Sequence, residues 1–565
     1  MCRVMIDPLC ATTSSKEEVW SRLVSSDSLS KAFRLDPLLQ MPHTASVLLP
    51  GVPFPKIYND SFTAKLTRRP MTELTRREIL AMLLTTPAAA SSWAQDTSES
   101  TDWTPLFDGK SLDGWKASEH EGSFKVVGGE ILVHGERSHL FYTGKVHNAD
   151  FRNFEFSAEI KTLPGSNSGV YFHTAFQPSG FPSAGFEVQV ENNPPAPLTG
   201  YVERKKTGSL YGVRNVYKTF AKNDEWFTLS ITVRGKLVQT RVNNLLVVDY
   251  IEPEQPFQAD KKFGRVLNHG TFALQGHDPG STTRFRNIRV RPLPDSASSE
   301  SSDRPEVDDL YREVIRLSTE NYPIVDYHVH LKGGLTIEQA LENSRRLGIN
   351  YGVAINCGLG FPVHSDESVQ QYLDSMKGQP CFIALQAEGR EWRTLVSPAS
   401  IARFDYVFTD AMTFTDDHGK RMRLWIDEEV GNIPDPQAFM DMLVDRILGV
   451  MREPIDIYAN PTFLPAQIAK DYETLWTPDR RRKVIAAAIE NHVAIEINNR
   501  YKIPSASFIK QAKAAGAKFS FGTNNADANL GRLEYPLAMV KECGLAWQDI
   551  FVPRSTGQKR IETGN

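Results

Sequence analysis

The pattern of apolar residues changes once along this 565-residue chain, and that change limits the folds open to it. From Trp103 to about Leu293, short runs alternate apolar and polar residues between Gly, Pro and Asn turns. Beyond a Ser-rich acidic stretch at 294–306, apolar runs of strand length alternate with helical runs. Repeated alternating strands predict an antiparallel β-sandwich, whereas strands that alternate with helices predict a parallel β/α barrel. We therefore expect two unlike domains joined by a linker.

Composition excludes some functions. The chain is 41% hydrophobic and 23% charged, as in globular proteins, and its formal net charge is −4. Without a long basic run, nothing indicates a nucleic-acid partner or an anionic membrane surface. Five cysteines fit neither a disulfide framework nor a CxxC zinc site. The sequence does not indicate an oligomeric state.

Residues 71–94 have the layout of an export signal. The run Thr75-Arg76-Arg77 precedes an apolar stretch too short to span a membrane, and small residues follow up to Ala94. This resembles a twin-arginine signal, which predicts a periplasmic or secreted protein with no stable membrane span after cleavage. An internal amphipathic helix is the alternative. Residues 1–70 are interpreted as an over-extended translation start or a poorly ordered tail.

The segment Asp326-Tyr-His328-Val-His330 follows an apolar run that ends at Val325. Alternate side chains of a strand point the same way, so the carboxylate and both imidazoles would share one face. These donors suit zinc, manganese or iron, and such a site can activate bound water. An ordinary strand end with surface histidines is the competing interpretation.

A family resemblance covers this second region, predicted as a barrel at 307–553 with a tail at 554–565. Its motifs are Asp326-x-His328-x-His330, Gln386-Ala-Glu388-Gly, Asp405 to Asp410, Glu496-Ile-Asn498 and Gly522 to Asp527. They resemble the PHP (polymerase and histidinol phosphatase) metal-dependent hydrolases, which are distorted β/α barrels with up to three metals. Asn356, Met412 and Asn460 stand where that family usually has further histidines. A full trinuclear site is therefore not expected.

The resemblance implies a smaller divalent metal site in the barrel. Its implied ligands are His328, His330, Glu388, Asp410 and Asp527, with Asn524 as an alternative to the last. Glu388 could instead act as the base on metal-bound water. The alternative is a barrel that kept its fold and lost its metal.

The first region carries a second resemblance, over residues 102–293. Its motifs are Leu106 to Trp115, Asn167-Ser-Gly-Val-Tyr-Phe172, Gly185-Phe-Glu-Val-Gln189, Gly208-Ser-Leu-Tyr-Gly212 and Leu274-Gln-Gly-His277 through Phe285-Arg-Asn-Ile288. They resemble the 3-keto-disaccharide hydrolase domain family, which is concanavalin-like and acts on sugars oxidised at C3. His173 stands where that family is expected to have arginine.

That chemistry needs a base, because a ketone at C3 acidifies the C2 proton and its removal can expel the C1 substituent. Glu187, Gln189 and His277 are the candidates for base, orienting group and enolate-facing group. The alternative is that they merely alternate outward on a strand or lie in a turn. The predicted sugar-binding residues are Trp115, Asn167, Tyr171, His173, Tyr211 and Gln275.

The sequence therefore predicts an exported carbohydrate-active hydrolase that cleaves a 3-keto-glycoside and carries an appended metal-dependent hydrolase barrel. The alternative is a non-catalytic carbohydrate-binding sandwich that delivers a PHP-type phosphoesterase or other hydrolase to its substrate.

Overall fold

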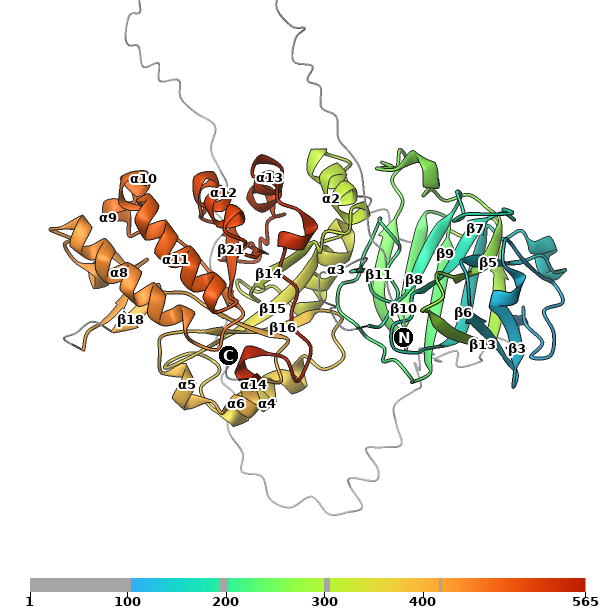
Figure 1. Ribbon diagram of the computed structural model, residues 1–565, viewed down its shortest axis with the longest axis horizontal. Helices are drawn as coiled ribbons and strands as arrows, with labels where there is room; N and C mark the ends of the chain where they lie inside the picture. Colours follow the sequence, from blue (N-terminus) through green and yellow to red (C-terminus); the bar gives the residue numbers. More distant parts are fainter. Residues whose placement is uncertain (1–102, 194–201, 299–304, 416–418, 564–565) are drawn as a thin grey trace, which may run out of the picture. The chain divides into compact units, whose positions relative to one another are not determined.

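The computed structural model describes residues 103–193, 202–298, 305–415 and 419–563, which belong to one compact unit (Figure 1). The predicted signal at 71–94 and the segment 1–70 lie outside the described residues, as does the middle of the predicted linker at 294–306. Within the described ranges, no helix combines the length and apolar character needed to cross a lipid bilayer.

The first domain is a sandwich of two antiparallel sheets, as the alternating pattern predicts. The larger sheet has the order β11-β10-β9-β6-β13-β4-β3, with β1 beside β13, and the smaller has the order β2-β5-β12-β7-β8. The strands are β1 (Thr104–Pro105), β2 (Trp115–Ala117), β3 (Phe124–Val127), β4 (Glu130–His134), β5 (Ser138–Tyr142), β6 (Asn153–Thr162), β7 (Ser168–Thr174), β8 (Phe186–Val190), β9 (Phe227–Arg234), β10 (Leu237–Val242), β11 (Leu245–Ile251), β12 (Thr271–Gly276) and β13 (Thr282–Leu293). Short 3-10 turns are η1 (Glu121–Ser123), η2 (Val146–Ala149) and η3 (Lys261–Phe263).

The two faces of the smaller sheet differ in character. Val170, Phe172 and Leu274 belong to the core between the sheets. Because successive strand residues point to opposite faces, Tyr171 and Gln275 point away from that core. This outer face carries the polar residues of the predicted sugar site.

The second domain is a closed barrel of seven parallel strands, in the order β14-β15-β16-β17-β20-β21-β22. The strands are β14 (Val325–Val329), β15 (Asn350–Cys357), β16 (Phe382–Ala387), β17 (Tyr406–Thr409), β20 (Ile457–Tyr458), β21 (Ala494–Asn498) and β22 (Phe519–Gly522), with a separate hairpin of β18 (Thr413–Thr415) and β19 (Arg421–Arg423). The helices are α3 (Ile337–Leu347), α4 (Asp366–Ser375), α5 (Trp392–Leu395), α6 (Pro398–Ile401), α7 (Asp427–Val430), α8 (Pro436–Met451), α9 (Ala466–Ala469), α10 (Tyr472–Leu475), α11 (Pro478–Glu490), α12 (Ala506–Ala514), α13 (Glu534–Glu542), η4 (Trp547–Asp549) and α14 (Arg560–Thr563). The predicted alternation of strands and helices is confirmed, while the PHP-like identity of the barrel stays a prediction.

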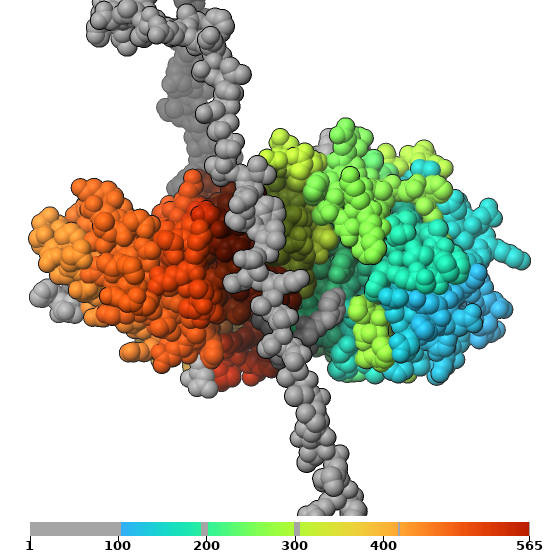
Figure 2. Space-filling view, turned by 45° about the horizontal axis from the view of Figure 1, so that its top comes forward, coloured from blue at the N-terminus to red at the C-terminus, as the bar shows by residue number. Residues whose placement is uncertain are grey.

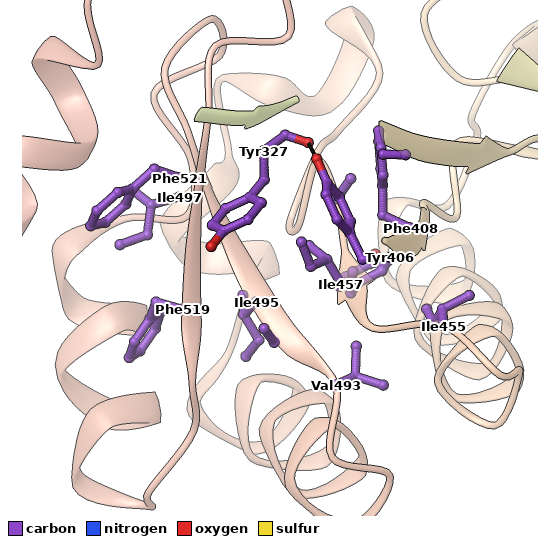
Figure 3. Packing of buried hydrophobic residues seen from close by; sticks show 14 of the residues in the cluster. Tyr327, Tyr406, Phe408, Ile455, Ile457, Val493, Ile495, Ile497, Phe519 and Phe521 are labelled. Atoms are coloured by element: carbon purple, nitrogen blue, oxygen red, sulfur yellow. Dashed lines mark hydrogen bonds between the residues drawn. The ribbon is translucent and has the colours of Figure 1, made fainter. Parts of the chain in front are cut away.

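Large apolar side chains fill the barrel between its strands (Figure 3). Tyr327 on β14 and Tyr406 on β17 pack edge to face, and the Tyr406 hydroxyl donates to the Tyr327 carbonyl at 2.6 Å. Phe519 and Phe521 on β22 are fully buried in the same cluster. The packed interior leaves the polar residues at the strand ends, where parallel barrels place their working groups.

Helix α2 (Asp309–Thr319) connects the two domains. Its N-terminus is capped by Asp308, whose side chain accepts a hydrogen bond from the Tyr311 backbone. Tyr311 and Ile315 join the sandwich core, whereas Val314 and Leu317 join the barrel core. One helix therefore takes part in both hydrophobic cores.

Candidate functional site

Adjacent strands of the smaller sheet bring the predicted catalytic residues together. Tyr171 on β7 pairs with Glu187 on β8, and Gly169 pairs with Gln189. Directly opposed residues of antiparallel strands point to the same face, so these side chains are neighbours. A Cβ atom on Gly169 would lie 2.8 Å from the Glu187 Oε1. Glycine at this position therefore gives the Glu187 carboxylate its room.

The outer face of the smaller sheet forms the floor of a cavity of about 470 Å³. Seven predicted residues line it: Asn167, Tyr171, Glu187, Gln189, Tyr211, Gln275 and His277. Its volume falls within the range of about 300–1,000 Å³ that is usual for small-molecule sites. The structure thus gathers most of the predicted sugar site in one place.

Glu187 is the best-anchored carboxylate of this cavity. The Tyr171 hydroxyl donates to its Oε2 at 2.7 Å, and the Gln275 amide donates to its Oε1 at 3.1 Å. The Arg265 guanidinium lies 3.6 Å from Oε2. Burial raises the pKa of Glu187, and the Arg265 charge and the Tyr171 hydrogen bond only partly oppose this rise. Glu187 therefore combines a fixed position with increased basicity.

Two amide oxygens of residues that line the cavity lack a hydrogen-bond partner within the described part of the chain. The Gln189 amide donates to the Asn167 side-chain oxygen at 2.8 Å. The Oε1 atoms of Gln189 and Gln275 are buried and have no hydrogen-bond partner within the described part of the chain. Buried acceptors without partners are costly, and sugar hydroxyls could satisfy them.

His277 follows the end of β12 and is positioned by the residue after it. Its Nδ1 lies 2.7 Å from the Asp278 carboxylate, which also accepts from the Ser281 hydroxyl at 3.0 Å. Its ring packs 5.9 Å from the ring of Phe181. An imidazole oriented by a carboxylate is suited to transfer protons.

Two predicted sugar-binding residues do not reach this cavity. Trp115 belongs to the core between the sheets, and its indole N–H donates to the Leu106 carbonyl at 2.7 Å. His173 is buried with φ 55°, and its Nε2 lies 2.9 Å from the Arg152 carbonyl. Strand alternation turns Trp115 inward, and backbone groups of Arg152 and Asn268 occupy both ring nitrogens of His173.

Sequence reasoning missed several residues that line the cavity. Arg265, Phe257 and Phe263 come from the segment between β11 and β12, while Ile315 and Thr319 come from α2. None belongs to a local motif that would indicate a site. Only the fold brings these segments to the sheet.

The barrel holds a second polar group at the end of β14. The His328 Nδ1 lies 2.6 Å from the Glu496 carboxylate, and the His330 Nδ1 lies 3.2 Å from the Ala354 carbonyl. Both Nε2 atoms are buried and, by distance and angle, make no hydrogen bond among the described residues, although the Gln386 side chain lies near enough to His330 to influence its pKa. The two rings are 5.1 Å apart. Metal-binding histidines show this arrangement, since the second ring nitrogen bonds a carboxylate or carbonyl.

The predicted acidic ligands are arranged differently. Asn356 donates to Glu388 at 2.8 Å, and Asn460 donates to Asp410 at 2.8 Å. Burial and the nearby charge of Asp410 raise the pKa of Glu388 to about 8. Asp527 is exposed and accepts from a backbone N–H two residues later. Amide side chains therefore engage the two buried carboxylates, and Asp527 lies on a surface loop.

The residues fit a metal only in part. Over the described ranges, no group of three or more His, Cys, Asp or Glu side chains is arranged to hold a metal ion. His328 and His330 fit a zinc, manganese or iron ion through their Nε2 atoms. The full predicted set does not fit, because Glu388 and Asp410 are engaged elsewhere and Asp527 is on the surface.

Comparison with known proteins finds similarities to the first domain. Residues 102–291 match the family model described as a 3-keto-alpha-glucoside-1,2-lyase-like domain. A 3-keto-disaccharide hydrolase of Bacteroides thetaiotaomicron is 24% identical over 231 residues, which are 33% of this chain and 77% of that protein.

Solved structures give weaker likenesses to about a third of the chain. A glycosyl hydrolase candidate from Parabacteroides distasonis is 22% identical with a TM-score of 0.30, covering 34% of this chain and 94% of that one. The carbohydrate binding module CBM66 from Bacillus subtilis is 14% identical with a TM-score of 0.22, covering 32% and 95%.

Proposed function

We propose that the chain is a carbohydrate-active hydrolase whose sandwich cleaves the glycosidic bond of a sugar oxidised at C3. The observation that carries this proposal is Glu187, a buried carboxylate with a raised pKa that faces a cavity shared with His277. The family match over 102–291 supports the same substrate class.

The reaction begins at C2 of the oxidised sugar. A base removes the C2 proton, and the C–H electrons form an enolate with the C3 ketone. Collapse of the enolate forms the C1=C2 bond and expels the C1 oxygen, which takes up a proton and leaves as an alcohol. Water then adds across C1=C2, with its hydroxyl at C1 and its proton at C2. The sum is hydrolysis of the glycosidic bond.

Glu187 is the base in this scheme. Its pKa is raised by burial, so its ionised form is a stronger proton acceptor than an exposed carboxylate. The donors Tyr171 and Gln275 fix its orientation, and an oriented base contributes about 10²–10⁴ in rate.

His277 and Arg265 act on the negative charges that develop on the enolate and on the departing C1 oxygen. His277 lies close enough to influence the pKa of Glu187, and Asp278 orients its ring for proton transfer to the departing oxygen or the enolate. The Arg265 guanidinium beside Glu187 supplies positive charge where the enolate forms. The free amide oxygens of Gln189 and Gln275 accept hydroxyl groups of the sugar.

The test follows the C2 proton. The full chain is incubated in D₂O with methyl 3-keto-glucoside and, as the control, with unoxidised methyl glucoside; enzyme-free samples measure spontaneous exchange. We expect only the oxidised sugar to be cleaved, with deuterium at C2 of the product. Cleavage without deuterium would exclude C2 proton removal, and binding without cleavage would favour a carbohydrate-binding sandwich.

A second function concerns the barrel. We propose that His328 and His330 bind one divalent transition metal through their buried Nε2 atoms. When bound, such an ion would supply Lewis-acid chemistry. The Glu496 carboxylate and the Ala354 carbonyl orient the two rings.

Elemental analysis of the full chain, purified without chelator, tests the metal proposal. About one zinc, manganese or iron per chain is expected, and none in the His328→Ala/His330→Ala variant. Equal metal in both proteins, or none after reloading the unmodified chain, would overturn the proposal.

A further inference from the structure

One wall of the sandwich cavity comes from outside the sandwich. Ile315 and Thr319 of α2 line the cavity together with residues of the smaller sheet. Helix α2 follows the segment 102–291 that matches the family model. In Figure 2, the yellow-green surface that includes α2 lies beside the green surface that precedes it in sequence. The cavity is therefore lined both by the segment that matches the family model and by a helix that follows this segment.

Helix α2 is firmly attached to the sandwich loop that borders the cavity. Asn215 donates to the Ser318 carbonyl at 2.9 Å, and the Thr319 hydroxyl lies 3.4 Å from the Gly212 carbonyl. A Cβ on Gly212 would come within 3.3 Å of that hydroxyl, so only a small residue allows this close approach without adjustment. The position of α2 against the cavity is thus fixed by direct bonds.

Asn321, two residues beyond the end of α2, organises the charged part of the same loop. The Asn321 side chain donates to the Val202 carbonyl at 2.7 Å and accepts from the Arg204 backbone at 3.2 Å. The Lys205 amine also lies 3.3 Å from its oxygen. Glu203 and Tyr211 of this loop line the cavity. By holding the loop, α2 and Asn321 therefore also position cavity residues that they do not contact directly.

The cavity has two kinds of wall. Its polar groups at Tyr171, Glu187, Gln189 and Gln275 come from strands of the sheet. Its apolar residues come mainly from segments outside the sheet: Phe181, Val213, Phe257, Ala259, Phe263 and Ile315. The polar floor can satisfy the hydroxyls of one sugar ring. Polar residues also line the cavity from outside the sheet, namely Glu203, Gln258, Asp260, Arg265 and Thr319. The side chains of Phe257 and Ile315 themselves offer nothing to the hydroxyls of a second sugar, whose desolvation against them would be costly.

We propose that Ile315 of α2 and Phe257 form a specificity wall for the group that leaves C1, and that this group is apolar and about the size of an aromatic ring. The proposal rests on the proposed function of the same cavity. The substrate is then a 3-keto-glycoside of an apolar alcohol rather than a 3-keto-disaccharide. An apolar wall discriminates in this way because it gains from burying hydrocarbon and loses by stripping water from hydroxyls.

The test compares three substrates with the same 3-keto-glucosyl group, using the full chain. Their leaving groups are methanol, 2-phenylethanol and a second glucose. The two simple alcohols have similar acidity, and glucose is the more acidic leaving group, so leaving-group acidity cannot produce a preference for phenylethyl over the disaccharide. We expect kcat/KM for the phenylethyl substrate to exceed that for the disaccharide by about tenfold or more.

Two variants test whether Ile315 and Phe257 cause the preference for the phenylethyl leaving group. Ile315→Asn and Phe257→Ser should each reduce the phenylethyl-to-methyl ratio of kcat/KM by about fivefold or more, while Ile315→Val, which stays apolar, should preserve it. Phe257 lies outside the helix, so its variant remains informative if Ile315→Asn does not fold. A ratio unchanged in both polar variants would overturn the inference.

The outcomes separate this inference from the function on which it rests. Cleavage of the methyl and disaccharide substrates without preference for phenylethyl would refute the apolar wall and leave the proposed reaction intact. If no 3-keto-glycoside is cleaved, the proposed function fails and the inference fails with it.

Discussion

The sandwich and the barrel both bury ionisable groups, but they satisfy them differently. In the sandwich, Glu187 accepts from Tyr171 and Gln275 and still faces a cavity of about 470 Å³. In the barrel, Glu388 and Asp410 accept from the asparagines Asn356 and Asn460. Amide groups bind the carboxylates in both domains, but the sandwich carboxylate also lines a cavity.

This difference explains why one predicted site is assembled and the other only in part. Asparagine can donate to a carboxylate, which an apolar replacement could not do. Asn460 also accepts from Asn498 and Asn524, so one amide links three elements of the barrel end. A polar network of this kind stabilises buried acids without a metal. At this end of the barrel, the Nε2 atoms of His328 and His330 are among the buried nitrogens of the described residues that make no hydrogen bond.

The strongest test of the comparison removes the sandwich carboxylate. Glu187→Gln keeps the shape of the side chain but cannot take a proton, so kcat/KM for a 3-keto-glycoside should fall by about 10²–10⁴-fold. The His328→Ala/His330→Ala variant is the control and should retain full activity on the same substrate. Equal losses in both proteins would contradict a division of labour between the domains.

A smaller effect is expected from the group that orients a barrel histidine. Glu496→Gln replaces the charged partner of the His328 Nδ1, which should weaken metal affinity by about 10–100-fold. Competition with a chromogenic chelator measures this affinity. Glu453→Gln, a buried barrel carboxylate that accepts from Trp392, is the matched control and should bind metal as the unmodified chain does.

A third change adjusts the base of the sandwich. Tyr171→Phe removes a hydrogen bond that lowers the pKa of Glu187, so that pKa should rise further. Because the base works only when ionised, the acidic limb of the kcat/KM profile should move to higher pH. Activity on that limb should fall by about fivefold to tenfold, with a smaller change on the plateau. An unmoved limb would exclude Glu187 as the titrating base.

The smallest expected effect is on the unfolding free energy, and it comes from Asp456, a buried barrel carboxylate that does not line the sandwich cavity. Burial raises the pKa of Asp456 from 3.8 to about 6, although its carboxylate accepts from the Val407 backbone. A folded-state pKa above the unfolded value contributes stability that is complete below pH 3.8 and is lost as pH rises through about 6. Relative to Asp456→Asn, the chain should therefore lose about 1 kcal/mol of unfolding free energy between about pH 5 and 6. Urea unfolding of both proteins at these two pH values measures the difference.

Periodicity was sufficient to predict both architectures, because strand alternation and strand-helix alternation are local properties. It also placed Glu187 and Gln189 on one face, since residues two apart on a strand point the same way. It failed for Trp115, whose inward direction depends on the register of β2 against β5. It could not find Arg265 or Ile315, which reach the cavity through long-range packing. The asparagine partners of Glu388 and Asp410 likewise depend on contacts between distant strands.

Helix α2 also bears on how the chain unfolds. Tyr311 and Ile315 belong to one hydrophobic core and Val314 and Leu317 to the other, within three turns of a single helix. Melting this helix would expose both cores at once, so the two domains should denature in one cooperative transition. A mutation that destabilises the barrel would then also lower the population of molecules with a folded sandwich cavity, although the mutated residue lies far from Glu187 in the sequence.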